Sequence, residues 1–172
     1  MDKQKTYYKL SNLSLYLKEN LLLRKEDIVK NVLESTPING EPEGYFIKLF
    51  LAPLLINFLK ENPEGLFIEG INSKGRTQFK KDFFGSKPAP DFIFKKYNTI
   101  GEVKYCKLRL RTFAVALGQL IAYIESSKNE VEKSQYGYLI FFNTEKRNGL
   151  TEQEKKFINL MWKRNNIFIT II

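Results

Sequence analysis

The stretch KPAPDFIFKKYNTIGEVKYCK, residues 87–107, determines how the rest of the chain is interpreted. Its apolar run FIF, the polar turn NTIG and the later run VKYC are typical of two short strands joined in a β-hairpin. Asp91 stands directly before the first run and Glu102 directly before the second. Because neighbouring strands lie ~5 Å apart, we expect the two carboxylates to converge on one point. Carboxylate oxygens are hard ligands that suit Mg²⁺.

Strand alternation places a cation beside these carboxylates. Glu102 and Lys104 are two residues apart, so their side chains point to one face of a strand while Val103 points to the other. A metal ion held by Asp91 and Glu102 would neutralise a phosphate and lower the pKa of a bound water. The lysine would position that water or stabilise developing charge. The pattern therefore indicates phosphodiester hydrolysis.

The order PD, ten intervening residues and EVK resembles the signature of the PD-(D/E)XK nuclease superfamily, which includes many restriction endonucleases and archaeal Holliday junction resolvases. Here the aspartate is Asp91 and EVK is Glu102-Val103-Lys104. The resemblance implies that Asp91 and Glu102 bind Mg²⁺, for which Mn²⁺ can substitute, with help from the main-chain carbonyl of Val103. It also implies that Lys104 orients or activates the attacking water. Asp82 is an alternative to Asp91 as the first metal-binding carboxylate, but no predicted strand directly follows Asp82.

The segment RTFAVALGQLIAYIE, residues 111–125, has apolar residues at helical spacing. Gln119 and Tyr123 lie one turn apart on this predicted helix. The arrangement resembles the helix with a QxxxY element that follows the EVK strand in many PD-(D/E)XK nucleases. The resemblance implies that Gln119 borders the active site.

An apolar segment that begins at Tyr45 is predicted to be a buried helix, kinked at Pro53. Glu41 and Glu43 stand at its start. In the resembling family a glutamate on the first core helix often lies near the metal site, and Glu43 is the better candidate because the helix follows it at once. The alternative is a solvated acidic pair favoured by the helix N-terminus.

Composition excludes several other kinds of site. The chain has 172 residues, one cysteine and no histidine. An internal disulfide, a cysteine-based zinc cluster and every histidine-dependent triad, metal site or nuclease are therefore excluded. Carboxylates and lysine would have to carry out any hydrolysis.

A formal charge of +9, from 28 basic and 19 acidic side chains, favours a polyanionic partner, which the motif indicates to be DNA. Two groups of basic side chains are candidates for contacts with the DNA backbone. One group precedes the motif in a basic loop, and the other follows the motif and would project to one side if the strand continues. An exposed turn and a solvated strand end are the alternatives. The candidates are Lys74, Arg76, Lys80 and Lys81, and then Lys107, Arg109 and Arg111.

The start of the chain, residues 1–9, is polar and charged and lacks the character of a signal peptide. The longest apolar segment, Tyr45–Leu59, is too short to span a bilayer. We expect a cytoplasmic protein that is not associated with a membrane.

The predicted fold is an α/β protein with a mixed central β-sheet flanked by helices, a restriction endonuclease-like core with an N-terminal helical extension. We expect a single domain, in which residues 1–40 are the extension and residues 41–172 the core. Thr151 and Glu154 show the pattern of a capping box. The predicted elements outside the hairpin and its helix are two helices within Leu10–Glu34, strands at Leu66–Ile71 and Tyr136–Phe142, a helix at Thr151–Asn165 and a strand at Ile167–Ile172.

Three hypotheses follow. The first is a Mg²⁺-dependent DNA endonuclease, of the restriction type rather than a Holliday junction resolvase, because the N-terminal extension exceeds a minimal resolvase and could serve recognition or dimerisation. The second is a non-catalytic DNA-binding or assembly subunit with the same fold. The third is an accidental motif in which Lys104 simply pairs with Glu102 on a sheet surface. A homodimer and a separate partner subunit both remain open.

Overall fold

The computed structural model describes residues 2–59, 65–71, 82–128 and 134–172. Short 3-10 or π-helical turns, labelled η, join several of the longer elements. The elements follow in the order α1 (Lys3–Leu21), η1 (Leu22–Arg24), α2 (Lys25–Ser35), α3 (Pro42–Phe46), η2 (Ile47–Leu51), α4 (Ala52–Phe58), β1 (Leu66–Ile68), β2 (Phe92–Phe94), η4 (Lys95–Tyr97), β3 (Thr99–Cys106), α5 (Leu110–Ser127), β4 (Tyr136–Asn143), α6 (Glu152–Asn165) and β5 (Ile167–Ile171).

Five strands form one mixed sheet in the order β1-β2-β3-β4-β5. The first three strands pair antiparallel, and the last three pair parallel. A hairpin forms, but its turn lies at residues 95–98 rather than at the predicted NTIG. Phe92–Phe94 pairs with Thr99–Gly101, which were predicted to belong to the turn, and the predicted second strand from Val103 onward does not pair with β2. The protein is therefore an α/β protein with a mixed sheet flanked by helices.

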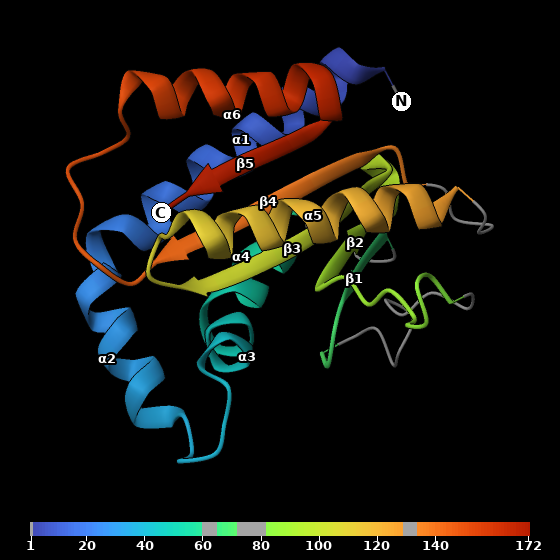
Figure 1. The fold of residues 1–172 in the computed structure, drawn as a ribbon. Helices are drawn as coiled ribbons and strands as arrows, with labels where there is room; N and C mark the ends of the chain where they lie inside the picture. The colour runs from blue at the N-terminus through green and yellow to red at the C-terminus, as the bar shows by residue number, and fades with distance from the viewer. Residues whose placement is uncertain (1, 60–64, 72–81, 129–133) are drawn as a thin grey trace.

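Helices cover both faces of the sheet (Figure 1), with α5 in front of β3 and β4 and with α1 and α4 behind the sheet. The N-terminal helices share a hydrophobic cluster with Phe92, Val103 and Tyr138 of the sheet. The opposite face packs against α5 and α6 through residues such as Ile100 and Leu139. The strand β4 is buried along its whole length, as expected for a central parallel strand. None of the described helices is both long and apolar enough to cross a membrane.

The capping box predicted for α6 is confirmed. The Glu154 backbone N–H donates to Thr151 Oγ1 at 3.2 Å, and the Thr151 backbone N–H donates to Glu154 Oε2 at 2.8 Å. These two bonds satisfy amides that have no partner within the helix, so a local four-residue pattern fixes where α6 begins.

The apolar segment after residue 41 differs from the predicted kinked helix. Helix α3 begins at Pro42, so Glu43 already lies in its first turn, and the π-helical turn η2 separates α3 from α4. Pro53 has no N–H to donate to the preceding turn, and a wider turn accommodates that loss. Strand β1 ends at Ile68 rather than at residue 71, because the chain turns through Gly70, whose φ is +70°.

Helix α1 is fastened to the last strand. Thr170 Oγ1 donates to Ser14 Oγ at 2.7 Å and shares a second hydrogen bond of 2.8 Å with the Tyr138 hydroxyl. Lys3 Nζ donates to Asn166 Oδ1 at 2.6 Å. The N-terminal extension is thus packed on the sheet as part of one hydrophobic core.

Gly101 permits the close approach of the two hairpin strands. A Cβ atom at this position would lie 1.9 Å from the Phe92 ring, and both residues are buried. We expect Gly101→Ala to lower the free energy of unfolding by about 2–3 kcal/mol, because the ring or the strand must move. Urea unfolding followed by circular dichroism measures this change.

Gly118→Ala is the matched control, because an added Cβ on this residue of α5 meets nothing within 4 Å. Alanine is the better helix former, so this variant should gain up to about 1 kcal/mol. Equal stability of the two variants would contradict the contact between Phe92 and Gly101.

Candidate functional site

The site lies along an edge of β3 that β2 leaves unpaired. Within the described chain, β2 pairs with β3 only over the first three residues of β3. Farther along, the Val103 N–H donates to Asp91 Oδ2 at 2.7 Å, and the Tyr105 N–H donates to Glu43 Oε2 at 3.1 Å. Alternate residues of a strand direct their N–H groups to the same edge. Two carboxylates from separate elements are therefore aligned on one strand edge.

The position of Asp91 is defined by its own backbone, which bridges β1 and β3. Its N–H donates to the Gly101 carbonyl at 3.0 Å, and its carbonyl accepts from the Glu69 N–H at 2.8 Å. Pro88 and Pro90 precede it and are buried. Because proline has a fixed φ, the segment that leads to Asp91 has few alternative conformations.

Lys104 lies between two of the carboxylates. Its Nζ atom is 2.6 Å from Glu102 Oε1 and 3.9 Å from Glu43 Oε1. Glu102 is only 3% exposed, so its charge is almost removed from solvent. A buried carboxylate requires a compensating charge, which Lys104 supplies. The structure thus brings the predicted residues Glu102, Lys104 and Glu43 together.

Helix α5 adds two polar side chains to this cluster. Burial, followed by the negative charges of Glu102 and Asp91, raises the pKa of the Tyr123 phenol, so this side chain lies close to both carboxyl groups. The Oε1 atom of Gln119 is buried and has no hydrogen-bond partner within the described part of the chain. An unsatisfied buried oxygen is costly, so this atom is suited to accept a hydrogen bond from a ligand or water.

Burial raises the pKa of the carboxyl groups in the cluster. For Asp91, burial is the largest cause and the negative charge of Glu102 is the next, and together they hold its pKa well above the usual value. The pKa values of Glu102 and Glu43 are raised chiefly by burial, and the ammonium of Lys104 offsets part of the increase. Burial by itself would lower the pKa of Lys104, but the surrounding carboxylates outweigh it and raise the pKa.

The donor set fits a hard divalent cation. Asp91 and Glu102 offer carboxylate oxygens, and the Val103 carbonyl points to the same strand edge as the Val103 N–H that faces Asp91. A cation would relieve the repulsion that raises the carboxyl pKa values. Across residues 2–59, 65–71, 82–128 and 134–172, no three Asp, Glu, Cys or His side chains form a metal cluster. A site here would therefore depend on two carboxylates and a backbone oxygen.

The cations that follow β3 do not form the predicted extended row. The strand ends before Lys107 and α5 begins before Arg111, so the three side chains do not alternate along one strand. Glu145 pairs with Lys107 at 3.3 Å and with Arg109 at 2.8 Å, whereas Arg111 is exposed. Four other predicted contacts lie outside the described residues: Lys74, Arg76, Lys80 and Lys81.

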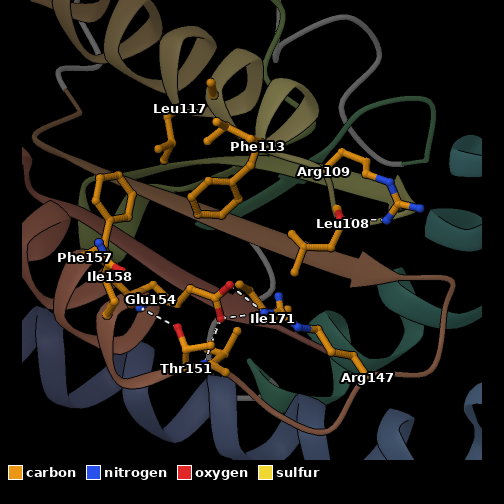
Figure 2. Close-up of a pocket in the computed structure, with 14 residues that line it drawn as sticks. Leu108, Arg109, Phe113, Leu117, Arg147, Thr151, Glu154, Phe157, Ile158 and Ile171 are labelled. Atoms are coloured by element: carbon orange, nitrogen blue, oxygen red, sulfur yellow. Dashed lines mark hydrogen bonds and ion pairs between the residues drawn. The ribbon is translucent and has the colours of Figure 1, made fainter.

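A separate cavity of about 590 Å³ lies on the other flank of α5, between α5 and α6 (Figure 2). Phe113 and Leu117 face it from α5, and Arg147 pairs with Glu154 at its side. On a helix, these two α5 positions lie on a different side from Gln119 and Tyr123. None of the cluster's carboxylates lines this cavity, so it is distinct from the candidate site.

Comparison of the chain with protein-family models, with curated proteins and with solved structures yields no significant match. The assignment of a function therefore depends on the geometry and electrostatics of the cluster.

The contacts of Tyr123 are the part of the site that the sequence did not predict. Its spacing from Gln119 indicated only that the two side chains share a flank of a helix. The contact with Glu102 depends on how α5 packs back over β3, for which the sequence has no local signal. Asp82, the competing carboxylate, is exposed and immediately precedes a tight turn.

The raised pKa of Asp91 predicts a pH-dependent stability in metal-free buffer. The folded protein keeps the proton at pH values at which an unfolded aspartate, with a pKa of about 3.9, has lost it. This contribution to the free energy of unfolding is full at low pH and is lost as pH rises through the folded pKa. We expect Asp91→Asn to gain stability relative to wild type as pH rises from about 4 to about 7, measured by urea unfolding in EDTA.

Glu145→Gln is a control of opposite sign. Hydrogen bonding to Arg109 is the main cause that lowers the pKa of Glu145, so the native carboxylate stabilises the fold above its usual pKa. This variant should lose stability relative to wild type over the same pH rise. The same pH response in both variants would refute the raised pKa of Asp91.

Proposed function

We propose that the protein is a metal-dependent DNA endonuclease with a restriction endonuclease-like core. The observation that carries the proposal is the gathering of Asp91, Glu102 and Lys104 at the edge of one hairpin, with raised carboxyl pKa values. A purely structural ion pair between Glu102 and Lys104 would gain nothing from a second carboxylate beside it, because Asp91 adds repulsion. Such repulsion is useful where a cation is to be bound.

Asp91, Glu102 and the Val103 carbonyl would hold Mg²⁺ or Mn²⁺. The bound cation would neutralise the scissile phosphate and lower the pKa of the attacking water. Gln119 would accept a hydrogen bond from that water or from the substrate through its unpaired Oε1. Glu43 supports the site by holding the Tyr105 amide and by sharing Lys104 with Glu102.

Lys104 acts as a cation rather than as a base. The carboxylates around it raise its pKa above the usual value despite its burial, so its amine carries a proton at neutral pH. A protonated lysine cannot remove a proton from water. It can orient the water and stabilise the charge that develops on the phosphate as the bond breaks.

The charge of the chain supports DNA as the substrate, because +9 favours a polyanion. Of the predicted DNA contacts within the described residues, Arg111 is exposed on α5. Lys107 and Arg109 share Glu145, so they would have to exchange that carboxylate for a phosphate. A homodimer or a partner subunit could supply further contacts.

A non-catalytic DNA-binding or assembly subunit is the second candidate function. The observation in its favour is the ion pair of 2.6 Å between Lys104 and Glu102. This pair already neutralises Glu102, one of the two carboxylates that would bind the metal. In that case Asp91 would serve only as an acceptor for the Val103 amide.

Cleavage assays on supercoiled plasmid and on a synthetic four-way junction test the first proposal. We expect cutting with Mg²⁺ or Mn²⁺ and none in EDTA, and the DNA that is cut separates a restriction-type enzyme from a junction resolvase. Asp91→Ala, Glu102→Ala and Lys104→Ala should each reduce the rate at least about 100-fold, because each removes charge stabilisation at the phosphate.

Lys155→Ala is the matched control, because this exposed lysine pairs with Glu152 on α6 and lies outside the cluster. It should cut DNA at the wild-type rate. Full activity in Glu102→Ala, or cutting that persists in EDTA, would exclude the proposed site.

Metal binding can be measured apart from cleavage. At a Mg²⁺ concentration of about 100 times its dissociation constant, the free energy of unfolding should rise by about 2.7 kcal/mol. Asp91→Asn should abolish this increase, whereas Asp82→Asn, which changes an exposed neighbour, should retain it. Absence of both metal stabilisation and DNA cleavage would favour the second candidate function, and an equal response of both variants would show that the metal binds elsewhere.

A further inference from the structure

A tight turn lies just ahead of Asp91 in the chain. Phe83 and Ser86 exchange two backbone hydrogen bonds, of 2.7 Å and 3.2 Å. The two residues between them have positive φ, +50° for Phe84 and +77° for Gly85. Two-residue turns with this backbone favour Asn, Asp and Gly, because other side chains are strained at positive φ. Phe84 is therefore an unfavourable residue at this position.

Burial does not compensate for that strain. Phe84 is 96% exposed, so its ring gains almost nothing from the hydrophobic core. Its contact is with the neighbouring Phe83 ring, edge to face, with ring centroids 4.7 Å apart and an interplanar angle of 77°. That contact steadies the Phe84 ring from one side. A strained and exposed aromatic residue indicates a role in binding rather than in stability.

The turn is connected to the candidate site by a short segment of chain. Phe84 and Asp91 are seven positions apart in the chain, so their Cα atoms lie within about 25 Å of each other. Pro88 and Pro90, both buried, anchor the segment between them. Lys87, at the base of the turn, is exposed and offers a cation for a phosphate.

We propose that Phe84 stacks on an unpaired nucleobase of the DNA strand bound at the site. An unpaired base offers its face at no cost, whereas insertion of a ring into a continuous duplex must first unstack two base pairs, at a cost in free energy. Within the described part of the chain, no insertion device accompanies the single ring of Phe84. The substrate class is therefore single-stranded or locally unpaired DNA, such as a fork, a junction or a frayed end. This inference rests on the proposed function, because it takes DNA as the ligand.

Binding assays in EDTA test this proposal without cleavage. Fluorescence anisotropy would compare oligo(dT) with an abasic oligomer of the same length, which has the phosphates but no bases. The wild-type protein should bind oligo(dT) more tightly. Phe84→Ala should weaken binding to oligo(dT) about tenfold and leave binding to the abasic oligomer unchanged.

Three further variants distinguish stacking from a structural effect. Phe84→Asn suits positive φ, so it should raise the melting temperature while it weakens binding to oligo(dT). Phe84→Trp should retain binding, and its added fluorescence should be quenched by oligo(dT) but not by the abasic oligomer. Tyr8→Ala removes another exposed aromatic side chain, on α1, and should bind like wild type.

The outcomes for this proposal and for the nuclease proposal are separable. Unchanged binding of Phe84→Ala to oligo(dT), or an equal loss of binding to both oligomers, would overturn the stacking role, whatever the cleavage assay shows. Base-dependent binding that requires Phe84 would support it even in a protein that cuts no DNA, and in that case only the nuclease proposal would fail.

Discussion

The open edge of β3 is the constraint on which the acidic cluster depends. Buried backbone N–H groups need acceptors, and where β2 stops they find them in the carboxylates of Asp91 and Glu43. These hydrogen bonds draw negative charges towards the buried Glu102, where water cannot screen them. Lys104 offsets part of the repulsion. The electrostatics of the cluster thus result from strand pairing that is left incomplete at one point.

The N-terminal helices contribute to this cluster through α3. That helix packs between α2 and β3, and its Phe46 ring stacks on Tyr105 with centroids 5.1 Å apart. Glu43 lies one turn before Phe46, so the same packing directs its carboxylate to the β3 edge. Helix α2 of the extension therefore packs against the helix that carries Glu43, and the extension also covers one face of the sheet.

The elements that the sequence predicted well are those with strong local signals. The presence of a hairpin follows from its two apolar runs, although its turn lies at residues 95–98 rather than 98–101, and α6 begins where Thr151 and Glu154 form their capping box. The contacts that the sequence did not predict join residues that are distant from each other in the chain. The partner of Arg109 is Glu145, 36 residues away, and the contact of Tyr123 with Glu102 depends on the packing of α5. Local periodicity carries no information about such pairs.

The hydrogen bond between Ser14 and Thr170 joins residues 156 positions apart. During synthesis at about 5–20 residues per second, α1 would leave the ribosome roughly 10–30 s before its partner strand. Throughout that interval α1, whose buried face carries Leu10, Leu13 and Leu17, lacks its contacts with β5. The nascent chain therefore exposes part of an apolar helix face until its last strand has been synthesised.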